Sequence, residues 1–249
     1  DGVADWEVGD RVALTFFRDW ESGRFDMKYH GAARGGSCDG VLSEQVVAPV
    51  RSLVAVPDYL TLEEAATLPC AGLTAWHALM ERGRPLEADQ TVLVLGTGGV
   101  SIFALQIAKA VGARVIVTSS SDAKLLRAKE LGADEGINYL EEPDWDKAVY
   151  RLTEKQGVDH VIEVGGPGTL PKSMNSVAAG GSIGLIGVLT GFEAPGESLF
   201  PLVARNVDLS GIYVGSREMF ERFTRFLAHH EIRPVISDSF SFEEVPVAY

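Results

Sequence analysis

The chain has 249 residues, of which 46% are hydrophobic and 23% are charged, a composition typical of an ordinary globular protein. Its formal net charge of −13 argues against nucleic-acid or anionic-membrane partners, which need clustered basic residues. No window approaches the roughly 18 consecutive apolar residues of a membrane span. The two cysteines, Cys38 and Cys70, favour a reducing compartment over a disulfide framework, so we expect a cytoplasmic protein.

The segment up to about Pro57 has the pattern of strands and turns. We expect strands over 11–17 and 41–48, separated by the glycine-rich stretch 31–40. The sequence Thr61-Leu62-Glu63-Glu64 then fits a capping box and predicts the start of a helix. A second helix is expected from Cys70 to Arg82, ending at Gly83.

Beyond Gly83, apolar runs alternate with segments of helical periodicity. Strands are predicted over 91–95, 114–118, 136–138, 158–164, 182–187 and 207–214. Helices are predicted to end at Val111 and to span 121–131, 144–155 and 169–178. A last helix starts at Ser216, with an apolar face of Met219, Phe220, Phe223, Phe226 and Leu227. This alternation predicts βαβ units around a doubly wound parallel sheet, an α/β fold with helices on both faces.

The strongest motif is a glycine loop between the strand 91–95 and the helix that follows it. Its residues are Gly96, Thr97, Gly98, Gly99, Val100 and Ser101. Gly96 allows a sharp turn, Gly98 allows close approach to a pyrophosphate, and a small residue at the third glycine position allows tight helix–strand packing. The N–H groups at the start of the helix would hold phosphates. The alternative is a tight turn without a ligand, which the strand–loop–helix context disfavours.

The end of the second strand predicts which dinucleotide binds. NAD-binding versions carry an acidic residue there, about 20 residues after the loop, for the ribose 2′-hydroxyl. This chain has Ser119 at that position and Lys124 one turn further, and hydroxyls with a cation suit a 2′-phosphate. The sequence therefore favours NADPH over NADH. In the alternative interpretation, Ser121 is an N-cap and Lys124 a solvated helix residue.

Several motifs in order resemble the medium-chain dehydrogenase/reductase superfamily, in its zinc-type alcohol dehydrogenase-like and quinone oxidoreductase-like branches. They are the glycine loop and the segments 68–76, 128–134, 137–139, 157–164 and 211–217. The resemblance implies part of a GroES-like β domain over 1–71, a Rossmann domain over 72–232 and a return segment over 233–249. It also implies that the chain is the middle of a longer enzyme.

The resemblance also implies roles for individual residues. Thr74, Val188, Leu189, Gly211 and Ile212 would line the nicotinamide. Gly98, Gly99 and Val100 would hold the pyrophosphate, and Lys124 and Tyr139 the 2′-phosphate. The alternative for Tyr139 is an aromatic side chain packed on the end of a strand.

The resemblance implies that Cys70 matches one of the three protein ligands of a catalytic zinc ion. Catalytic zinc needs three protein ligands, and the sequence leaves this site undecided while favouring Cys70 as a small buried residue at a helix start. The structural zinc of the family needs four cysteines between Asp10 and Ser43, where Cys38 stands alone, so we expect none. The five histidines show no ligand spacing.

These features together predict an NADPH-dependent oxidoreductase that transfers a hydride between nicotinamide and a carbonyl, enone, quinone or alcohol. A non-catalytic NADPH-binding protein with a structural or sensing role is the alternative; a methyltransferase is disfavoured by Val94-Leu95 before the loop. The sequence assigns neither the small-molecule substrate nor a catalytic proton donor. We also expect a homodimer through an edge strand at 207–214, unless the final segment 234–249 covers that edge.

Overall fold

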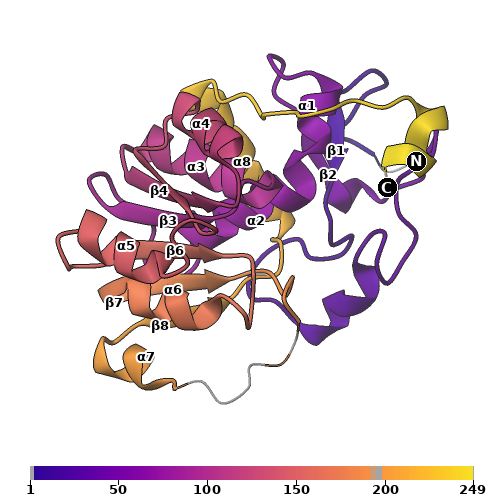
Figure 1. The fold of residues 1–249 in the computed structure, drawn as a ribbon. Coiled ribbons are helices and arrows are strands. Elements are labelled where there is room, and N and C mark those ends of the chain that lie inside the picture. The colour runs from indigo at the N-terminus through magenta and orange to yellow at the C-terminus, as the bar shows by residue number, and fades with distance from the viewer. Residues whose placement is uncertain (1–2, 192, 194–197, 249) are drawn as a thin grey trace.

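The computed structural model describes residues 3–191, 193 and 198–248 and contains two sheets (Figure 1). The strands of the larger sheet are β3 (Thr91–Leu95), β4 (Arg114–Ser119), β5 (Glu135–Asn138), β6 (Val158–Glu163), β7 (Val177–Leu185) and β8 (Asp208–Gly211). Their spatial order is β5-β4-β3-β6-β7-β8, and neighbouring strands run parallel. The predicted α/β fold with a parallel sheet is confirmed.

Helices cover both faces of this sheet because its strands are apolar on both sides. They are α2 (Leu73–Trp76), α3 (Gly99–Val111), α4 (Asp122–Glu130), α5 (Trp145–Leu152), α6 (Leu170–Ser176) and α8 (Arg217–His230). Val92 and Val94 of β3 belong to a core with Phe223 of α8, whereas Leu93 belongs to a second core with Trp145 of α5. Alternate residues of a strand point to opposite faces, so α2, α3 and α8 form one layer and α5 and α6 the other.

The order of the strands creates a crevice at the carboxyl ends of the strands of the larger sheet. The chain passes from β3 through α3 to β4 on one side, while β6 lies on the other side of β3. In open α/β sheets, ligands bind beyond the carboxyl ends of the strands at such a reversal. The arrowheads of β6 and β7 point toward the N-terminal segment (Figure 1), so this segment borders the crevice.

The N-terminal segment contains the small antiparallel sheet of β1 (Val12–Leu14) and β2 (Leu53–Ala55). The first strand is thus shorter than the predicted 11–17. The predicted strand 41–48 is wrong: this segment has bends and irregular backbone, and most of its residues are exposed. Strands need a partner for their backbone groups, and none of the described residues pairs with 41–48. β2, which the sequence did not single out, takes the place beside β1 instead.

The helical start at Thr61 is confirmed. In α1 (Leu62–Ala66) the Thr61 hydroxyl accepts the Glu64 N–H at 3.1 Å, and the Glu64 carboxylate accepts the Thr61 N–H at 2.8 Å. The following helix combines a π-helical turn at Leu68–Gly72, α2 and a second π-helical turn at His77–Glu81. It ends before Gly83, whose φ of 64° suits glycine at a helix end.

Most other boundaries agree with the sequence to within a few residues. Ser121 caps α4 and Ser216 caps α8, and Phe220, Phe223 and Leu227 of the predicted apolar face are buried. The sequence did not predict α7 (Phe200–Ala204), the short 3₁₀ helices Met27–Ala32, Val50–Ser52 and Phe242–Glu244, or α9 (Val245–Ala248).

The final segment runs past α1 and ends near the N-terminus (Figure 1). Along it, the Arg233 carbonyl accepts the Gln106 side-chain amide at 2.7 Å and the Arg233 guanidinium lies 2.8 Å from the Glu64 carboxylate. The segment therefore passes α3 and α1, away from β8.

Candidate functional site: a dinucleotide crevice

The crevice begins with the loop 96–98, which leads from β3 into α3. Gly96 has a φ of 71°, which glycine adopts without strain. A Cβ at Gly96 or at Gly98 would meet no atom within 4 Å, so both glycines face open space. Ser101 fills the third motif position: it is buried and its hydroxyl donates to the Leu95 carbonyl at 2.7 Å. A small side chain is needed there because α3 lies close to β3.

The N-terminus of α3 is free to bind an anion. Gly98 is the N-cap of this 13-residue helix, and no side chain caps its first N–H groups. These include the N–H groups of Gly99 and Val100, of which Gly99 is exposed. Uncapped N–H groups and the helix dipole together attract phosphate. Open space at the glycines and free donors beyond them fit a bound pyrophosphate.

The end of β4 presents hydroxyls and a lysine. Ser119 is buried, and its hydroxyl accepts the Ser121 N–H at 3.4 Å. Ser120, which the sequence analysis did not assign, is exposed beside it, and Lys124 is exposed on the first turns of α4. Ser121 accepts the Lys124 N–H at 3.4 Å, so the N-cap role of Ser121 and an exposed Lys124 both hold. Neither excludes a 2′-phosphate at this position.

A pocket of about 270 Å³ extends the crevice along the ends of β3, β4 and β6. It brings together three of the predicted residues, because Gly96, Tyr139 and Leu189 all line it. Tyr139 follows β5, and its N–H donates to the Ser119 carbonyl at 3.0 Å. Tyr139 is 39% exposed, so part of the residue is covered at the end of β5 and part is open to the pocket. The other lining residues are Leu95, Thr118, Trp145, Val164, Gly165, Thr169 and Thr190.

Glu163, at the end of β6, organises the far wall of this pocket. The side chain is fully buried. One carboxylate oxygen accepts the N–H groups of Gly165 and Gly166 at 2.7 and 3.0 Å and the Thr169 hydroxyl at 2.6 Å, and the other accepts the Ser173 hydroxyl. No role for Glu163 is predicted from the sequence above, although an acidic residue at the end of an apolar strand and before two glycines is a recognisable signal for a residue that holds a loop.

The residues predicted around the nicotinamide are distributed more widely. Val188 is exposed beside Leu189, Thr74 is buried with its hydroxyl donating to the Cys70 carbonyl at 2.7 Å, and Ile212 is buried. Gly211 lines a different pocket, of about 170 Å³, with Trp20, His77 and Tyr213 among its other residues. The structure thus brings Gly96, Tyr139 and Leu189 into one pocket, whereas the other predicted pyrophosphate, adenosine and nicotinamide residues do not line it.

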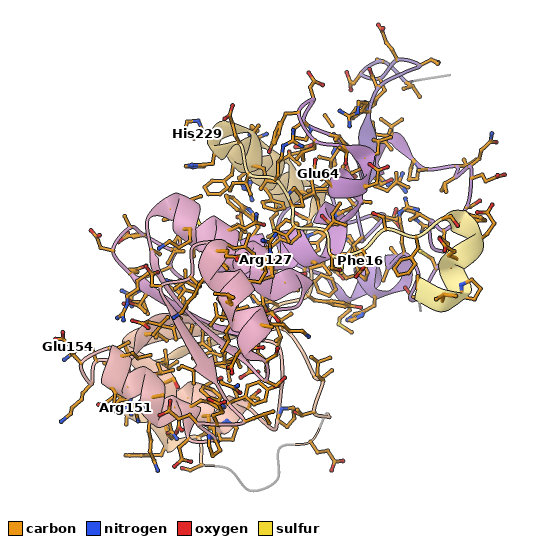
Figure 2. The ribbon with its side chains drawn as sticks, turned by 45° about the horizontal axis from the view of Figure 1, so that its top comes forward. Phe16, Glu64, Arg127, Arg151, Glu154 and His229 are labelled. Carbon is orange, nitrogen blue, oxygen red and sulfur yellow. The ribbon has the colours of Figure 1, made fainter. Side chains whose placement is uncertain are left out.

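Cys70 lies on the first π-helical turn and is exposed, contrary to its interpretation as a buried residue. It borders a groove of about 720 Å³ together with Pro69, Glu44 and Phe16, which is labelled in Figure 2. Although the residue is exposed overall, desolvation by the surrounding groove raises the pKa of the metal-free Cys70 thiol. Within 3–191, 193 and 198–248, no three His, Cys, Asp or Glu side chains are arranged to hold a metal. The described residues therefore do not fit a complete zinc site.

The histidines occupy separate environments. His77 is buried, its Nδ1 lies 2.7 Å from the Val214 carbonyl, and burial lowers its pKa. Figure 2 shows His229 at the outer end of α8, where both it and His230 are exposed. Among the helices of the described chain, none has the length and apolarity required to cross a bilayer.

Comparison with known proteins identifies similar sequences across the whole chain. Residues 99–229 match the family model described as zinc-binding dehydrogenase. A zinc-type alcohol dehydrogenase-like protein of Schizosaccharomyces pombe is 42% identical over 255 residues, which cover 100% of this chain and 73% of that protein. The chain thus spans about three quarters of the length of this relative.

Solved structures give the same relationship. A protein of Sinorhizobium meliloti 1021 that is provisionally described as an alcohol dehydrogenase superposes on this chain with a TM-score of 0.93. The two are 47% identical, over 99% of this chain and 72% of that one. A structure described as an NAD-dependent alcohol dehydrogenase superposes with a TM-score of 0.81 at 33% identity, over 94% and 70% of the two chains. Quinone oxidoreductases are also among the matching structures, one of them solved in complex with NADPH.

Proposed function

This chain belongs to the zinc-binding dehydrogenase family, and from that premise we propose an NADPH-dependent hydride transfer between nicotinamide and a carbonyl, enone, quinone or alcohol. The family makes it an oxidoreductase of the alcohol dehydrogenase and quinone oxidoreductase type that uses a nicotinamide cofactor. The choice of NADPH and the range of substrates are our proposal.

The proposal depends chiefly on the open loop and uncapped N-terminus of α3. Gly96 and Gly98 leave space where a side chain would otherwise stand, and the N–H groups of Gly99 and Val100 point out of the first turn without a side-chain cap. Thr97 completes the loop between the two glycines. This arrangement fits a pyrophosphate, although the net charge of the chain is negative, because the helix terminus acts locally.

The preference for NADPH is supported by the end of β4. Ser119 occupies the position of the ribose acid, Ser120 is exposed next to it and Lys124 is exposed on α4. A carboxylate at this position would repel a phosphate, whereas hydroxyl donors and an ammonium group would bind it. Tyr139 lines the pocket at the ends of β3, β4 and β6 and would pack against the adenosine.

When bound, the nicotinamide supplies the hydride chemistry. The chain contributes binding and orientation: Glu163 fixes the loop after β6 through four hydrogen bonds, and this loop forms a wall of the pocket. We place Thr74, Val188, Leu189, Gly211 and Ile212 toward the nicotinamide end. Their task is to orient the ring and exclude water. We propose the same division of the chain as above, with 1–71, 72–232 and 233–249 as separate units.

We assign no step to zinc, because Cys70 lacks two further ligands among the described residues. The expected outcome is that the purified 249-residue chain holds no stoichiometric metal after dialysis. Elemental analysis checks this, and one zinc per chain would contradict it.

A panel of quinones, enones, aldehydes and alcohols tests the function, with oxidation or reduction of the nicotinamide followed at 340 nm. Turnover of at least one compound with NADPH is expected, and a Gly98→Val variant should lose both turnover and NADPH binding because the side chain fills the pyrophosphate space. Gly31→Val is the matched control, since a Cβ there also meets open space but outside the crevice. NADPH binding without turnover on any compound would favour the structural or sensing alternative.

We further propose a homodimer through β8. This strand is the last in the sheet, and the final segment of the chain passes α1 and α3 instead of covering it. Leu209 is exposed on this strand, and Phe200 and Val203 are exposed on the nearby α7. A second copy paired edge to edge would satisfy the free backbone groups and bury this apolar surface.

A further inference from the structure

A second cluster of polar side chains lies toward the opposite ends of the strands from the dinucleotide crevice. His160 on β6 is paired in register with Ser182 on β7, and Ser182 is paired with Asp208 on β8. Residues in register on parallel strands point to the same face, so these side chains form one row across three strands. On the other side of His160 its register partner is Val92, and Gln90, two residues earlier and just before β3, contacts the imidazole through its side chain.

Two hydrogen bonds hold the imidazole of His160 between an amide and a hydroxyl. Its Nε2 lies 3.1 Å from Oε1 of Gln90, and its Nδ1 lies 2.8 Å from the Ser182 hydroxyl. The ring is 4% exposed. Both distances are within the range of a nucleophile–base contact and of a base held by a third residue.

The backbone fixes which nitrogen carries the proton. Oε1 of Gln90 also accepts the N–H of Glu87 at 2.9 Å, and a backbone N–H can only donate, so an oxygen must face it. His160 therefore donates through Nε2–H to that oxygen. In the neutral ring Nδ1 is then an acceptor, and the Ser182 hydroxyl must donate to it. Burial lowers the pKa of His160, which keeps the ring neutral at pH 7.

The dyad opens into a small cavity. A pocket of about 100 Å³ is lined by Ser182, His160, Gln90 and Arg84, together with the glycine turn 180–181 and the two acids Asp159 and Asp208. Ser182 is only partly buried, so a reagent can reach its hydroxyl. The guanidinium of Arg84 donates to the Gly180 carbonyl and places a positive charge at the wall. The pocket is small, so we expect a short acyl group to fit it better than a long chain.

We propose that Ser182 is a nucleophile activated by His160, with Gln90 as the positioning residue, and that it reacts with short-chain activated carboxylic esters. The Ser182 oxygen attacks the ester carbonyl carbon while its proton passes to Nδ1 of His160. The new oxygen–carbon bond replaces the bond to the alcohol or phenol, which leaves with the proton from Nδ1 of His160, so that the acyl group stays on Ser182 and the imidazole is neutral again. Water then attacks the acyl-serine with His160 as base, and it releases the carboxylic acid and regenerates the hydroxyl. This activity is separate from hydride transfer and needs no nicotinamide cofactor.

The test is to treat the full chain with p-nitrophenyl acetate at pH 7.5, follow nitrophenol release and locate acetyl groups by peptide mass spectrometry. We expect an acetyl group on Ser182 and a rate that falls at least about a hundredfold in His160→Gln, as for loss of a general base. The acetate should react faster than p-nitrophenyl hexanoate because the pocket is small. Ser182→Ala should abolish this labelling and leave NADPH binding unchanged.

Ser210→Ala is the matched control, because Ser210 is also partly buried on a neighbouring strand and has no histidine hydrogen bond among the described residues. It should retain the full rate of labelling at Ser182. Mapping of the wild-type protein decides the proposal even if a variant fails to fold. Acetyl groups confined to lysines and tyrosines, or equal labelling of Ser182 and Ser210, would overturn it.

Discussion

At the scale of single residues, we propose that one position at the end of β4 sets the choice between the two nicotinamide cofactors. Ser119 stands where an acid would bind a ribose hydroxyl, and Lys124 is exposed within the first turns of α4. The residue types at the end of β4 predict a preference for NADPH, because cofactor choice depends on the charge of a few side chains and this charge follows from residue type. The hydrogen bonds of Ser119 and Ser121 could not be predicted, because they depend on the local turn.

We expect Lys124→Ala to weaken NADPH binding several-fold, a loss on the order of 1 kcal/mol for one exposed phosphate contact. NADH binding should hardly change, because NADH lacks the 2′-phosphate. Fluorescence titration of both cofactors measures this. Lys129→Ala is the control, since Lys129 is exposed on the last turn of the same helix. Equal affinity of the wild type for the two cofactors, or tighter NADH binding, would contradict the assignment.

Glu163 stands in a recognisable sequence context, but its four hydrogen bonds appear only in the structure. Replacing it with Gln removes the charge and puts an amide NH₂ against groups that donate to it, so we expect a loss of about 2–3 kcal/mol in the free energy of unfolding. Urea unfolding measures the change. The exposed Glu154, labelled in Figure 2, provides the control variant Glu154→Gln. If both variants unfold at the same urea concentration as the wild type, the carboxylate does not stabilise the loop.

At the scale of elements, the βα units follow closely from local sequence. β3 matches its predicted bounds, and α3 ends at Val111 before Gly112 as predicted. Long apolar runs with glycine at their ends specify such units because the strand is buried on both faces and the helix on one. The predicted strand over 41–48 is wrong because local sequence is not enough to form a strand. Its alternating residues resemble a strand, but strand formation depends on a partner elsewhere in the chain.

The packing of the helix that starts at Leu68 against α8 gives a test at this scale. A Cβ at Gly72 would lie 2.8 Å from Cε1 of Phe223 and 3.3 Å from Cε1 of Phe103. We expect Gly72→Ala to destabilise the fold by about 1–3 kcal/mol through overpacking, measured by thermal or urea unfolding. Gly31→Ala, where the added Cβ meets no atom within 4 Å, should differ little from the wild type. Equal stability of the two variants would show that α8 shifts at no cost.

At the scale of the whole molecule, the edge strand β8 decides how copies can associate. The Ile212 N–H donates to Leu185 of β7 at 2.9 Å, and successive residues of a strand point their N–H groups to alternate sides. The N–H of Leu209 therefore points outward from the sheet. Pairing with a second copy would use this group, whereas the chain's own sheet does not.

Leu209→Pro should for that reason disrupt the dimer while leaving the fold of each chain intact, because it removes only an outward donor. Light scattering at micromolar concentration should give a dimer for the wild type and a monomer for this variant. Leu209→Thr, which keeps the N–H, should remain dimeric. A monomeric wild type, or a dimer that tolerates the proline, would place the contact elsewhere or remove it.

The sequence by itself determined the fold class, the glycine loop and the family resemblance, because periodicity, glycine spacing and residue charge are local properties. It also located the edge strand through the family's strand order. Only the tertiary structure decided which residues meet: Glu163 with its four donors, Tyr139 with Gly96 in one pocket, and His160 between Gln90 and Ser182. The four donors of Glu163 lie within ten residues of it, but their convergence depends on the turn after β6. The contacts of Tyr139 and His160 join distant segments, 70 residues apart in the case of His160 and Gln90, and their geometry follows from the packing of neighbouring strands, which no local pattern specifies.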